Sequence, residues 1–332
     1  MEAAVRTGKE LISATRPFAV ESRRKSWAYV LSSLAIWAGL LAVAAFAPPW
    51  PVRLLASVVA GLVTVRVFIL YHDYLHGAIL RNSRPADVIM KLYGLLVLTP
   101  SRVWKQTHNY HHAHTAKIVG SHVGSYAMVT TKMWKEQLTP GQRLMYRITR
   151  HPLTIAVGYL TIFIYGMCIS SLLRNPRKNW DSAVSVVLHG AILWALYQAG
   201  GTSMMFFVGM LPLIVACASG AYLFYAQHNF EGVHIQPREE WSFERAALES
   251  SSYMRLGPVM NWFTGNIGYH HVHHLNPTIP FYRLPEAMAQ IPELQHPHET
   301  GLWPKDIIAC FRLKLWDPDR QRMVGYRDAE TA

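Results

Sequence analysis

The chain has 332 residues, of which 51% are hydrophobic and 16% charged, and its formal net charge is +12. These values fit either one large soluble domain or a membrane protein. A soluble protein this basic would suggest nucleic-acid binding, but here the basic residues flank long apolar segments, as they do at membrane surfaces. Nucleic acid is therefore not an expected partner. The three cysteines, Cys168, Cys217 and Cys310, are scattered, which argues against a disulfide framework or a thiolate metal site.

Five apolar runs of about 18 residues or more indicate a membrane protein. In chain order they are Trp27–Ala47, Val52–Tyr71, Leu153–Leu173, Ser182–Ala199 and Met204–Tyr225. The first run is long and lacks a clear small-residue cleavage site, so we expect it to stay as a spanning helix. The shorter run Val88–Leu98 carries Lys91 and predicts a partly inserted or interfacial helix.

The distribution of basic residues predicts the topology. Basic residues precede the first run, which places the N-terminus in the cytoplasm, and basic residues at both ends of Leu153–Leu173 suggest that this run enters and leaves on the same side. The last two runs are expected to form a helical hairpin joined by Gly200-Gly201 on the outer side. The result is four spanning helices, with five spans as the alternative.

The fold class that follows is an all-α integral membrane protein with four transmembrane helices and additional interfacial helices. We expect one domain over residues 1–332: a cytoplasmic segment 1–26, transmembrane helices with an intervening cytoplasmic loop over 27–226, and a cytoplasmic cap of short helices over 227–332. A short amphipathic stretch is expected near Asp306–Leu315. The expected location is a bacterial inner membrane or a similar membrane, as a multi-pass protein.

Nine histidines lie just outside the apolar runs, in three clusters and one isolated position. They form one HxxxH, two HxxHH clusters and a lone residue, namely His72, His76, His108, His111, His112, His270, His273, His274 and His228. Spacings of three and four residues place side chains on one face of a helix. The pattern predicts one site that is assembled from four distant segments on the cytoplasmic side.

Nine imidazoles are too many for one metal ion, because first-row metals accept four to six ligands. Two ions, each with four or five imidazoles and room for water or oxygen, fit the count. Imidazole suits iron, zinc, copper and nickel, so the ligand type alone leaves the metal open. Paired haems or a structural zinc site would need fewer histidines, and a zinc hydrolase would need an HExxH that is missing. Asp73 lies between two of the histidines, but its side chain should point away from their shared face.

The other histidines and two polar residues have weaker patterns. His114 and His271 fall off the helical spacing and are interpreted as contacts behind the ligand rings or as incidental, and His189 as a helix–helix contact. Glu231 and Asn266 are modest candidates for accepting the distal N–H of a ligand imidazole. The remaining histidines show no pattern; they are His122, His151, His234, His296 and His298.

Four segments resemble the membrane-bound fatty acid desaturases of the three-histidine-box, acyl-lipid type. They are His-Asp-Tyr-Leu-His-Gly-Ala from His72, His-Asn-Tyr-His-His from His108, Gln-His-Asn-Phe-Glu-Gly around His228, and Gly-Asn-Ile-Gly-Tyr-His-His-Val-His-His-Leu ending at Leu275. The stretch Ile279–Ala287 is also similar to the bacterial and plastid-type branch, and the resemblance covers residues 70–290. It implies two non-haem iron ions as a di-iron site, O2 as co-substrate and an acyl-lipid or acyl-thioester substrate held beside membrane lipid.

The resemblance implies an O2-dependent di-iron fatty acyl desaturase that introduces a double bond into a membrane-associated acyl chain. The chain contains no fused cytochrome b5 segment and no flavin or nicotinamide motif, so electrons would come from a separate ferredoxin-like or cytochrome b5-like protein. A fatty acid or alkane hydroxylase, or a carotenoid-type oxygenase, is the alternative on the same scaffold. A metal transporter or haem-binding membrane protein is a third hypothesis, although transport would place the ligands near the middle of the membrane.

Overall fold

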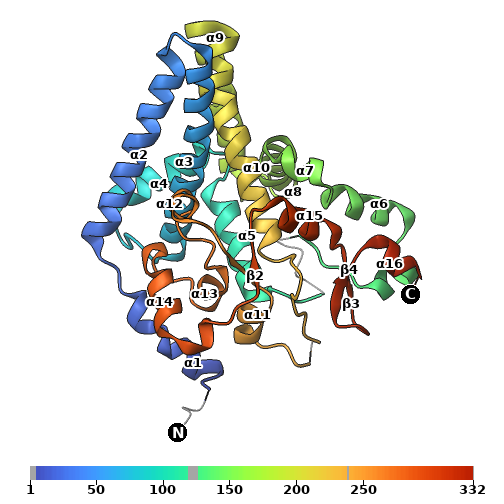
Figure 1. Ribbon diagram of the computed structural model, residues 1–332. Helices are drawn as coiled ribbons and strands as arrows, with labels where there is room; N and C mark the ends of the chain where they lie inside the picture. Colours follow the sequence, from blue (N-terminus) through green and yellow to red (C-terminus); the bar gives the residue numbers. More distant parts are fainter. Residues whose placement is uncertain (1–4, 119–125, 238, 332) are drawn as a thin grey trace.

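The computed structural model describes residues 5–118, 126–237 and 239–331. Its tallest elements are the apolar helices α2 (Arg23–Phe46) and α3 (Trp50–His76) and the helical stretch Trp180–Ala226, which stand upright beside one another (Figure 1). Within the described residues, these three segments are long and apolar enough to cross a membrane. Shorter helices and loops gather below them.

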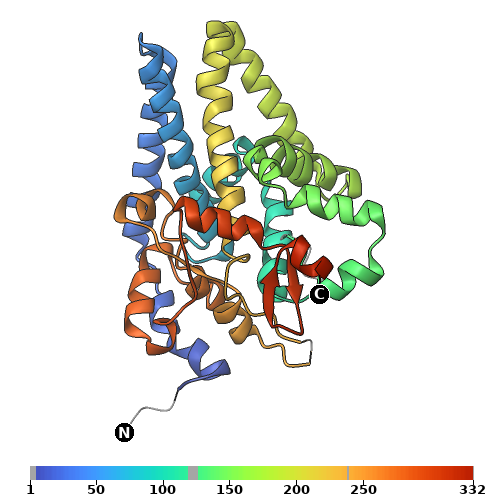
Figure 2. The ribbon, with the colours of Figure 1, turned by 45° about the vertical axis from the view of Figure 1, so that its right-hand side comes forward.

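The stretch Trp180–Ala226 folds back on itself. It consists of α9 (Trp180–Met204), the π-helix η4 (Met205–Met210) and α10 (Leu211–Ala226), and Figure 2 shows its two arms rising and descending. The backbone is non-helical at Gly200 and Gly201, and Gly201 has a φ of 66°, which glycine adopts without a steric cost. The chain therefore reverses at Gly200-Gly201, where a connection was predicted.

The run Leu153–Leu173 is broken into short helical pieces. These are α7 (Pro152–Ala156), the π-helix η3 (Tyr159–Ser170) and α8 (Ser171–Arg174). Its longest continuous apolar helix, Tyr159–Arg174, is shorter than the three long segments. Gly158 packs where an added Cβ would lie 3.2 Å from the carbonyl oxygen of Cys217, so this segment rests closely on α10.

Two helices follow α3 within the described residues up to 118. Ser83 caps α4 (Arg84–Leu96) by accepting a hydrogen bond from the Ala86 N–H, as Ser commonly does at a helix N-terminus. This helix corresponds to the predicted run Val88–Leu98 but begins four residues earlier. It leads into α5 (Ser101–His114). The described residues from 126 onward then form η2 (Met133–Gln137) and α6 (Pro140–Thr149).

The remainder of the chain surrounds the lower ends of the long helices. The N-terminus forms α1 (Gly8–Ala14) and η1 (Arg16–Ala19). Residues after α10 form α11 (Phe243–Glu249), α12 (Pro258–Phe263), α13 (His270–Leu275), η5 (Phe281–Arg283), α14 (Leu284–Gln290), η6 (Pro292–Leu294), α15 (Pro304–Arg312) and α16 (Tyr326–Thr331).

Within the described residues the protein is mostly helical, in line with the predicted fold class, and four short strands that were not predicted interrupt its C-terminal part. β1 (Tyr253–Met254) pairs in parallel with β2 (Glu299–Thr300), and β3 (Leu315–Asp317) pairs antiparallel with β4 (Arg322–Val324). The carboxylate of Asp317 accepts the N–H groups of Asp319 and Arg320 and closes the turn between β3 and β4. Because β3 begins at Leu315, the helix in the predicted amphipathic stretch Asp306–Leu315 ends earlier, at Arg312.

The lower half of α3 is the centre of the core and holds neighbouring elements in place. Tyr71 donates a hydrogen bond to the carbonyl of Thr99, just before α5. The guanidinium of Arg66 donates to Ser33 of α2 and to the carbonyl of Trp262 in α12. These contacts fix α2, α5 and α12 around the end of α3, where the first two clustered histidines lie.

Candidate metal centre

Four elements deliver the nine clustered histidines to one place. The last two turns of α3 carry His72 and His76, and the C-terminal turns of α5 carry His108, His111 and His112. The short helix α13 carries His270, His273 and His274, and His228 follows the end of α10 by two residues. The structure therefore brings together all nine histidines that the sequence singled out.

The nine imidazoles form two groups. The five-histidine group is His72, His76, His108, His112 and His273, and the four-histidine group is His111, His228, His270 and His274. Within each group, one candidate ligand nitrogen from every residue lies within 4.8 Å of all the others. The division into five and four agrees with the count of two ions, each with four or five imidazoles.

The ring nitrogens approach one another too closely and too often for hydrogen bonding alone. In the five-histidine group, the Nε2 of His108 lies 3.0 Å from the Nε2 of both His72 and His112. A neutral ring nitrogen carries either one hydrogen or one lone pair. The Nε2 of His108 therefore cannot form good hydrogen bonds to both neighbours at once.

The four-histidine group repeats this arrangement. The Nε2 of His228 lies 3.0 Å from the Nε2 of both His111 and His270, and His270 in turn is 3.1 Å from His274. Two nitrogens bound at about 2.1 Å to one ion, at right angles, would lie about 3 Å apart. The spacing in both groups fits one cation in each, bound by imidazole nitrogen, as first-row transition metals prefer.

Burial keeps these imidazoles neutral, which is the form that binds a metal. Desolvation lowers the pKa of His228 to about 4, and desolvation together with the neighbouring histidines holds the pKa of His108 and His274 well below its usual value. The pKa values of His111, His112, His270 and His273 are lowered in the same way. At neutral pH the lone pairs are therefore available.

The lowered pKa values predict that the metal-free protein is destabilised by acid. A buried histidine binds its proton more readily in the unfolded chain, where the pKa is about 6.5. The stabilisation is therefore complete above about pH 6.5 and is lost as the pH falls toward the folded value, about 4 for His228. Thermal unfolding in detergent at a series of pH values should show a falling midpoint below about pH 6.5. A midpoint that stays constant down to about pH 4.5 would contradict the neutral, buried state of these rings.

Several ligand rings are oriented by contacts to their distal nitrogen. The Nδ1–H of His228 donates to the carbonyl of Ser250 at 2.9 Å, and the Nδ1 of His274 lies 3.3 Å from the hydroxyl of Thr115. Such contacts fix the tautomer that presents Nε2 to the metal. Sequence reasoning missed both partners, because neither lies in a histidine cluster.

Asp73 makes the most extensive of these distal contacts. Its Oδ1 lies 3.0 Å from the Nδ1 of His72, and its Oδ2 accepts the backbone N–H of Phe281 at 2.7 Å. The residue is 1% exposed. Its side chain thus belongs to neither group, as predicted, but it lies behind a ligand ring and ties α3 to η5. Its position next to His72 was the only sequence signal for this contact.

The residues with weaker patterns lie outside both groups. The ring of His114 stacks on Tyr110 at 3.8 Å, and the ring of His271 donates to the carbonyl of Leu294. His189 bonds to the hydroxyl of Tyr159, which is a helix–helix contact of the predicted kind. His151, His234, His296 and His298 also belong to neither group, and His122 lies outside the described residues.

The two polar candidates do not contact the ligand rings. Glu231 is exposed, and the amide of Asn266 donates to the carbonyl of Phe281. Within the part of the chain that the structure describes, neither side chain forms a hydrogen bond to a clustered histidine. Asn266 is linked to His72 only indirectly. It binds the carbonyl of Phe281, and the N–H of Phe281 in turn contacts Asp73.

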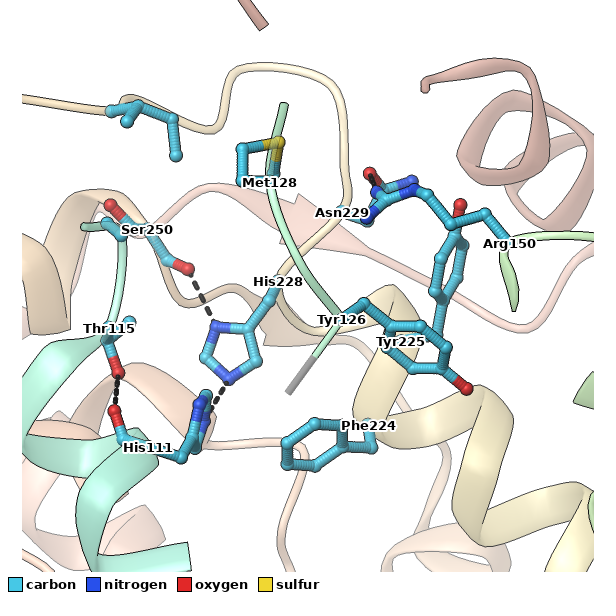
Figure 3. A pocket seen from close by; sticks show the side chains of 12 residues that line it. His111, Thr115, Tyr126, Met128, Arg150, Phe224, Tyr225, His228, Asn229 and Ser250 are labelled. Carbon is cyan, nitrogen blue, oxygen red and sulfur yellow. Dashed lines mark hydrogen bonds between the residues drawn. The ribbon is translucent and has the colours of Figure 1, made fainter. Parts of the chain in front are cut away.

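A pocket adjoins the four-histidine group. Figure 3 shows the rings of His111 and His228 on one side, with Phe224 beside them. The Phe224 ring centroid lies 4.9 Å from that of His111 and 5.8 Å from that of His228. The rest of the wall is partly apolar or aromatic, from Ala116, Tyr126, Met128, Tyr225 and Ile235. Its polar part comes from Thr115, Arg150, Asn229 and Ser250. The arrangement can hold a hydrocarbon segment next to the histidines.

Comparisons with known proteins agree with this geometry. The family model described as Fatty acid desaturase matches residues 48–305. A fatty acid desaturase of Bacillus subtilis is 29% identical, over 96% of this chain and 91% of the relative. The sn-1 oleoyl-lipid 12-desaturase of Synechocystis is 23% identical over 91% and 86%, respectively. The sn-2 acyl-lipid omega-3 desaturase (ferredoxin) of Helianthus annuus is 26% identical over 79% of this chain and 60% of the relative.

Proposed function

The chain belongs to the fatty acid desaturase family, and we propose that it uses O2 and two non-haem iron ions to introduce a double bond into a membrane-associated acyl chain. Membership of this family makes it a membrane oxidoreductase of lipid metabolism. The observation that carries the finer proposal is the convergence of nine imidazoles into groups of five and four.

We assign one iron to each histidine group. His72, His76, His108, His112 and His273 would hold one ion, and His111, His228, His270 and His274 the other. Bound iron supplies the redox chemistry with O2 that removal of hydrogen from an unactivated C–H bond requires. The protein holds the neutral ring nitrogens in position and, through the apolar residues around them, keeps water away. Haem binding is disfavoured, because a haem takes at most two axial histidines.

Two apolar spaces support an acyl substrate. The first is the pocket beside His111 and His228. The second lies between α3, α10 and α12 and is lined by Leu62, Val65, Tyr222, Leu223, Met260 and Phe263, among others. Val65 precedes His72 by seven residues, which is two helical turns on the same face of α3. An alkyl chain in this second space would extend along α3 toward the histidines.

The proposed membrane arrangement has four spanning helices: α2, α3 and the two arms of the Trp180–Ala226 hairpin. Basic residues Arg23, Arg24 and Lys25 begin α2, which supports a cytoplasmic N-terminus. Because α2 and α3 cross in opposite directions, the histidines at the end of α3 would then face the cytoplasm. We propose a bacterial inner membrane or a similar membrane as the location; a bacterial desaturase is among the similar proteins.

The substrate and the electron donor are proposed from the relatives. Two of them are named for acyl groups carried on lipid, and one of these is named for ferredoxin. We therefore propose an acyl group esterified to a membrane lipid as the substrate, and a separate ferredoxin-like protein as the electron donor. The positive net charge of +12 would favour docking of an acidic donor through charge complementarity.

Lipid analysis after expression tests the proposal. The chain should be expressed together with a ferredoxin and its reductase in a bacterium whose lipids contain both saturated and mono-unsaturated fatty acids, and total lipids should then be analysed by mass spectrometry. We expect acyl chains with one additional double bond in the polar-lipid fraction. Hydroxylated chains would instead indicate a hydroxylase on the same scaffold. An unchanged lipid profile, in cells where the protein is present in the membrane and contains iron, would contradict desaturation.

A further inference from the structure

Helix α6 is anchored to the rest of the protein through one face only. It begins with a capping box in which Thr139 and Gln142 satisfy each other's backbone N–H groups. Tyr146 is buried against Trp134 and donates a hydrogen bond to the carbonyl of Lys314, and Arg150 is buried at the C-terminal end. The inward face of α6 is therefore fixed.

The outward face of α6 is apolar and is exposed among the residues that the structure describes. Leu144 and Met145 are each 59% exposed and Ile148 is 46% exposed, and their spacing places them on one stripe of the helix. The apolar segment that follows α6 in the chain also has exposed side chains, at Leu153, Val157 and Leu160. A contiguous apolar patch of this kind marks a contact surface, unlike single exposed apolar residues.

The segment that contains α6 is strongly basic. Residues 131–149 contain four basic side chains and one acidic side chain, which gives a net charge of +3; they are Lys132, Lys135, Arg143, Arg147 and Glu136. Both lysines are exposed. An apolar stripe flanked by basic side chains is the pattern of helices that lie in the surface of a membrane.

The position of α6 matches the edge of a bilayer. In Figure 2, α6 lies across the direction of the long helices, at about the height at which α9 begins. The first residue of α9 is Trp180, which is exposed, and the guanidinium of Arg102 lies 5.2 Å from its ring centroid. Tryptophan is typical of membrane–water interfaces.

We propose that α6 docks into the bilayer surface, with Leu144, Met145 and Ile148 among the acyl chains and the nearby basic residues against anionic phospholipid headgroups. The bilayer is favoured over a protein partner because the apolar segment that follows α6 in the chain, Leu153–Leu160, also has exposed side chains. The docking itself follows from the exposed face and its charge.

Docking of α6 would also link the bilayer to the histidines, and this link rests on the proposed function. Arg150, at the C-terminal end of α6, lines the pocket beside His111 and His228. A leaflet that contacts α6 would therefore lie close to that pocket. This would favour lipid-bound acyl chains as the substrate over water-soluble thioesters.

Spin-label accessibility in lipid nanodiscs tests the docking. Single cysteines replacing Leu144, Met145 and Ile148 would be labelled in the full-length protein, with Gln137→Cys as an exposed polar control just before the capping box of α6. The three native cysteines are buried and should react slowly. We expect the labels at Leu144, Met145 and Ile148 to be more accessible to oxygen than to a water-soluble nickel complex, and the label at Gln137 to show the reverse. Water-like accessibility at all four positions would overturn the proposal.

A second measurement tests whether the basic residues near α6 bind anionic phospholipid headgroups. The ratio of docked to undocked α6 would be measured in nanodiscs with and without phosphatidylglycerol. Three chains would be compared: the parent, the double variant Lys132→Gln/Lys135→Gln, and a control. The control, Lys305→Gln, alters an exposed lysine on α15. Each lysine near the surface should raise this ratio roughly fivefold in anionic membranes at moderate salt. Equal ratios for the parent and the double variant would overturn the electrostatic part. Neither measurement requires turnover, so the docking can be tested even if desaturation fails.

Discussion

Replacement of His273 by alanine is expected to abolish desaturation while the protein remains in the membrane. His273 is fully buried, and its Nε2 lies 3.1 Å from the Nε2 of His112 in the five-histidine group. Its ring centroid also lies 4.5 Å from that of His72. Alanine would remove one of five nitrogens and leave a cavity in its place. We expect turnover to fall by more than the roughly 10–100-fold that loss of an outer contact to a ligand costs.

The loss should be specific to the group that is altered. His111→Ala removes a nitrogen from the four-histidine group and should likewise abolish turnover. His114→Ala is the matched control, because His114 lies on the same helix but stacks on Tyr110 and belongs to neither group. Lipid profiles, membrane content and iron per chain should be measured for all three variants. Normal turnover in His273→Ala or His111→Ala would disprove the ligand role of that residue.

The histidines could be predicted because helical spacing alone places them on shared faces. The structure adds which histidine joins which group. Residues four apart stay together, as for His108 and His112, whereas the adjacent His111 joins the other group. Successive helical residues point about 100° apart, so neighbours in sequence diverge to different ions. For the same reason the adjacent His273 and His274 join different groups, the five-histidine and the four-histidine group.

The contacts behind the ligand rings could not be predicted from the sequence. The carbonyl of Ser250 that accepts from His228 lies 22 residues further along the chain, and Thr115 meets His274 across 159 residues. Such partners depend on how helices pack, which spacing does not reveal. For the same reason Asn266, chosen for its proximity in sequence, holds a backbone carbonyl instead of a ligand ring.

The long apolar elements followed from hydropathy, but the small strands did not. Gly200-Gly201 marked the reversal between α9 and α10, because only a glycine adopts the φ of Gly201 without strain. Strands β3 and β4 have three residues each, which is too short to produce an alternating pattern. They form because Trp316 is buried there, and its backbone N–H donates to the carbonyl of Val129 across the chain.

Replacement of Asp73 by asparagine is expected to weaken metal binding by roughly 10–100-fold, the usual effect of removing an outer partner of a ligand histidine. Asp73 faces two hydrogen-bond donors, the Nδ1–H of His72 and the backbone N–H of Phe281. A carboxylate offers an acceptor to each. An asparagine amide offers one acceptor oxygen and one donor NH2 group. In either orientation the NH2 group would face one of the two N–H donors, that of His72 or that of Phe281. The ring of His72 should then rotate or change tautomer.

A comparison with Asp87→Asn separates this effect from general loss of a carboxylate. Asp87 forms a surface ion pair with Lys91 at 2.7 Å and accepts the hydroxyl of Tyr74, and neither partner belongs to a histidine group. Exposed pairs of this kind contribute about 0–1 kcal/mol. Metal content during dialysis against a chelator should therefore fall faster in Asp73→Asn than in Asp87→Asn. Equal rates of loss would show that His72 keeps its orientation without Asp73.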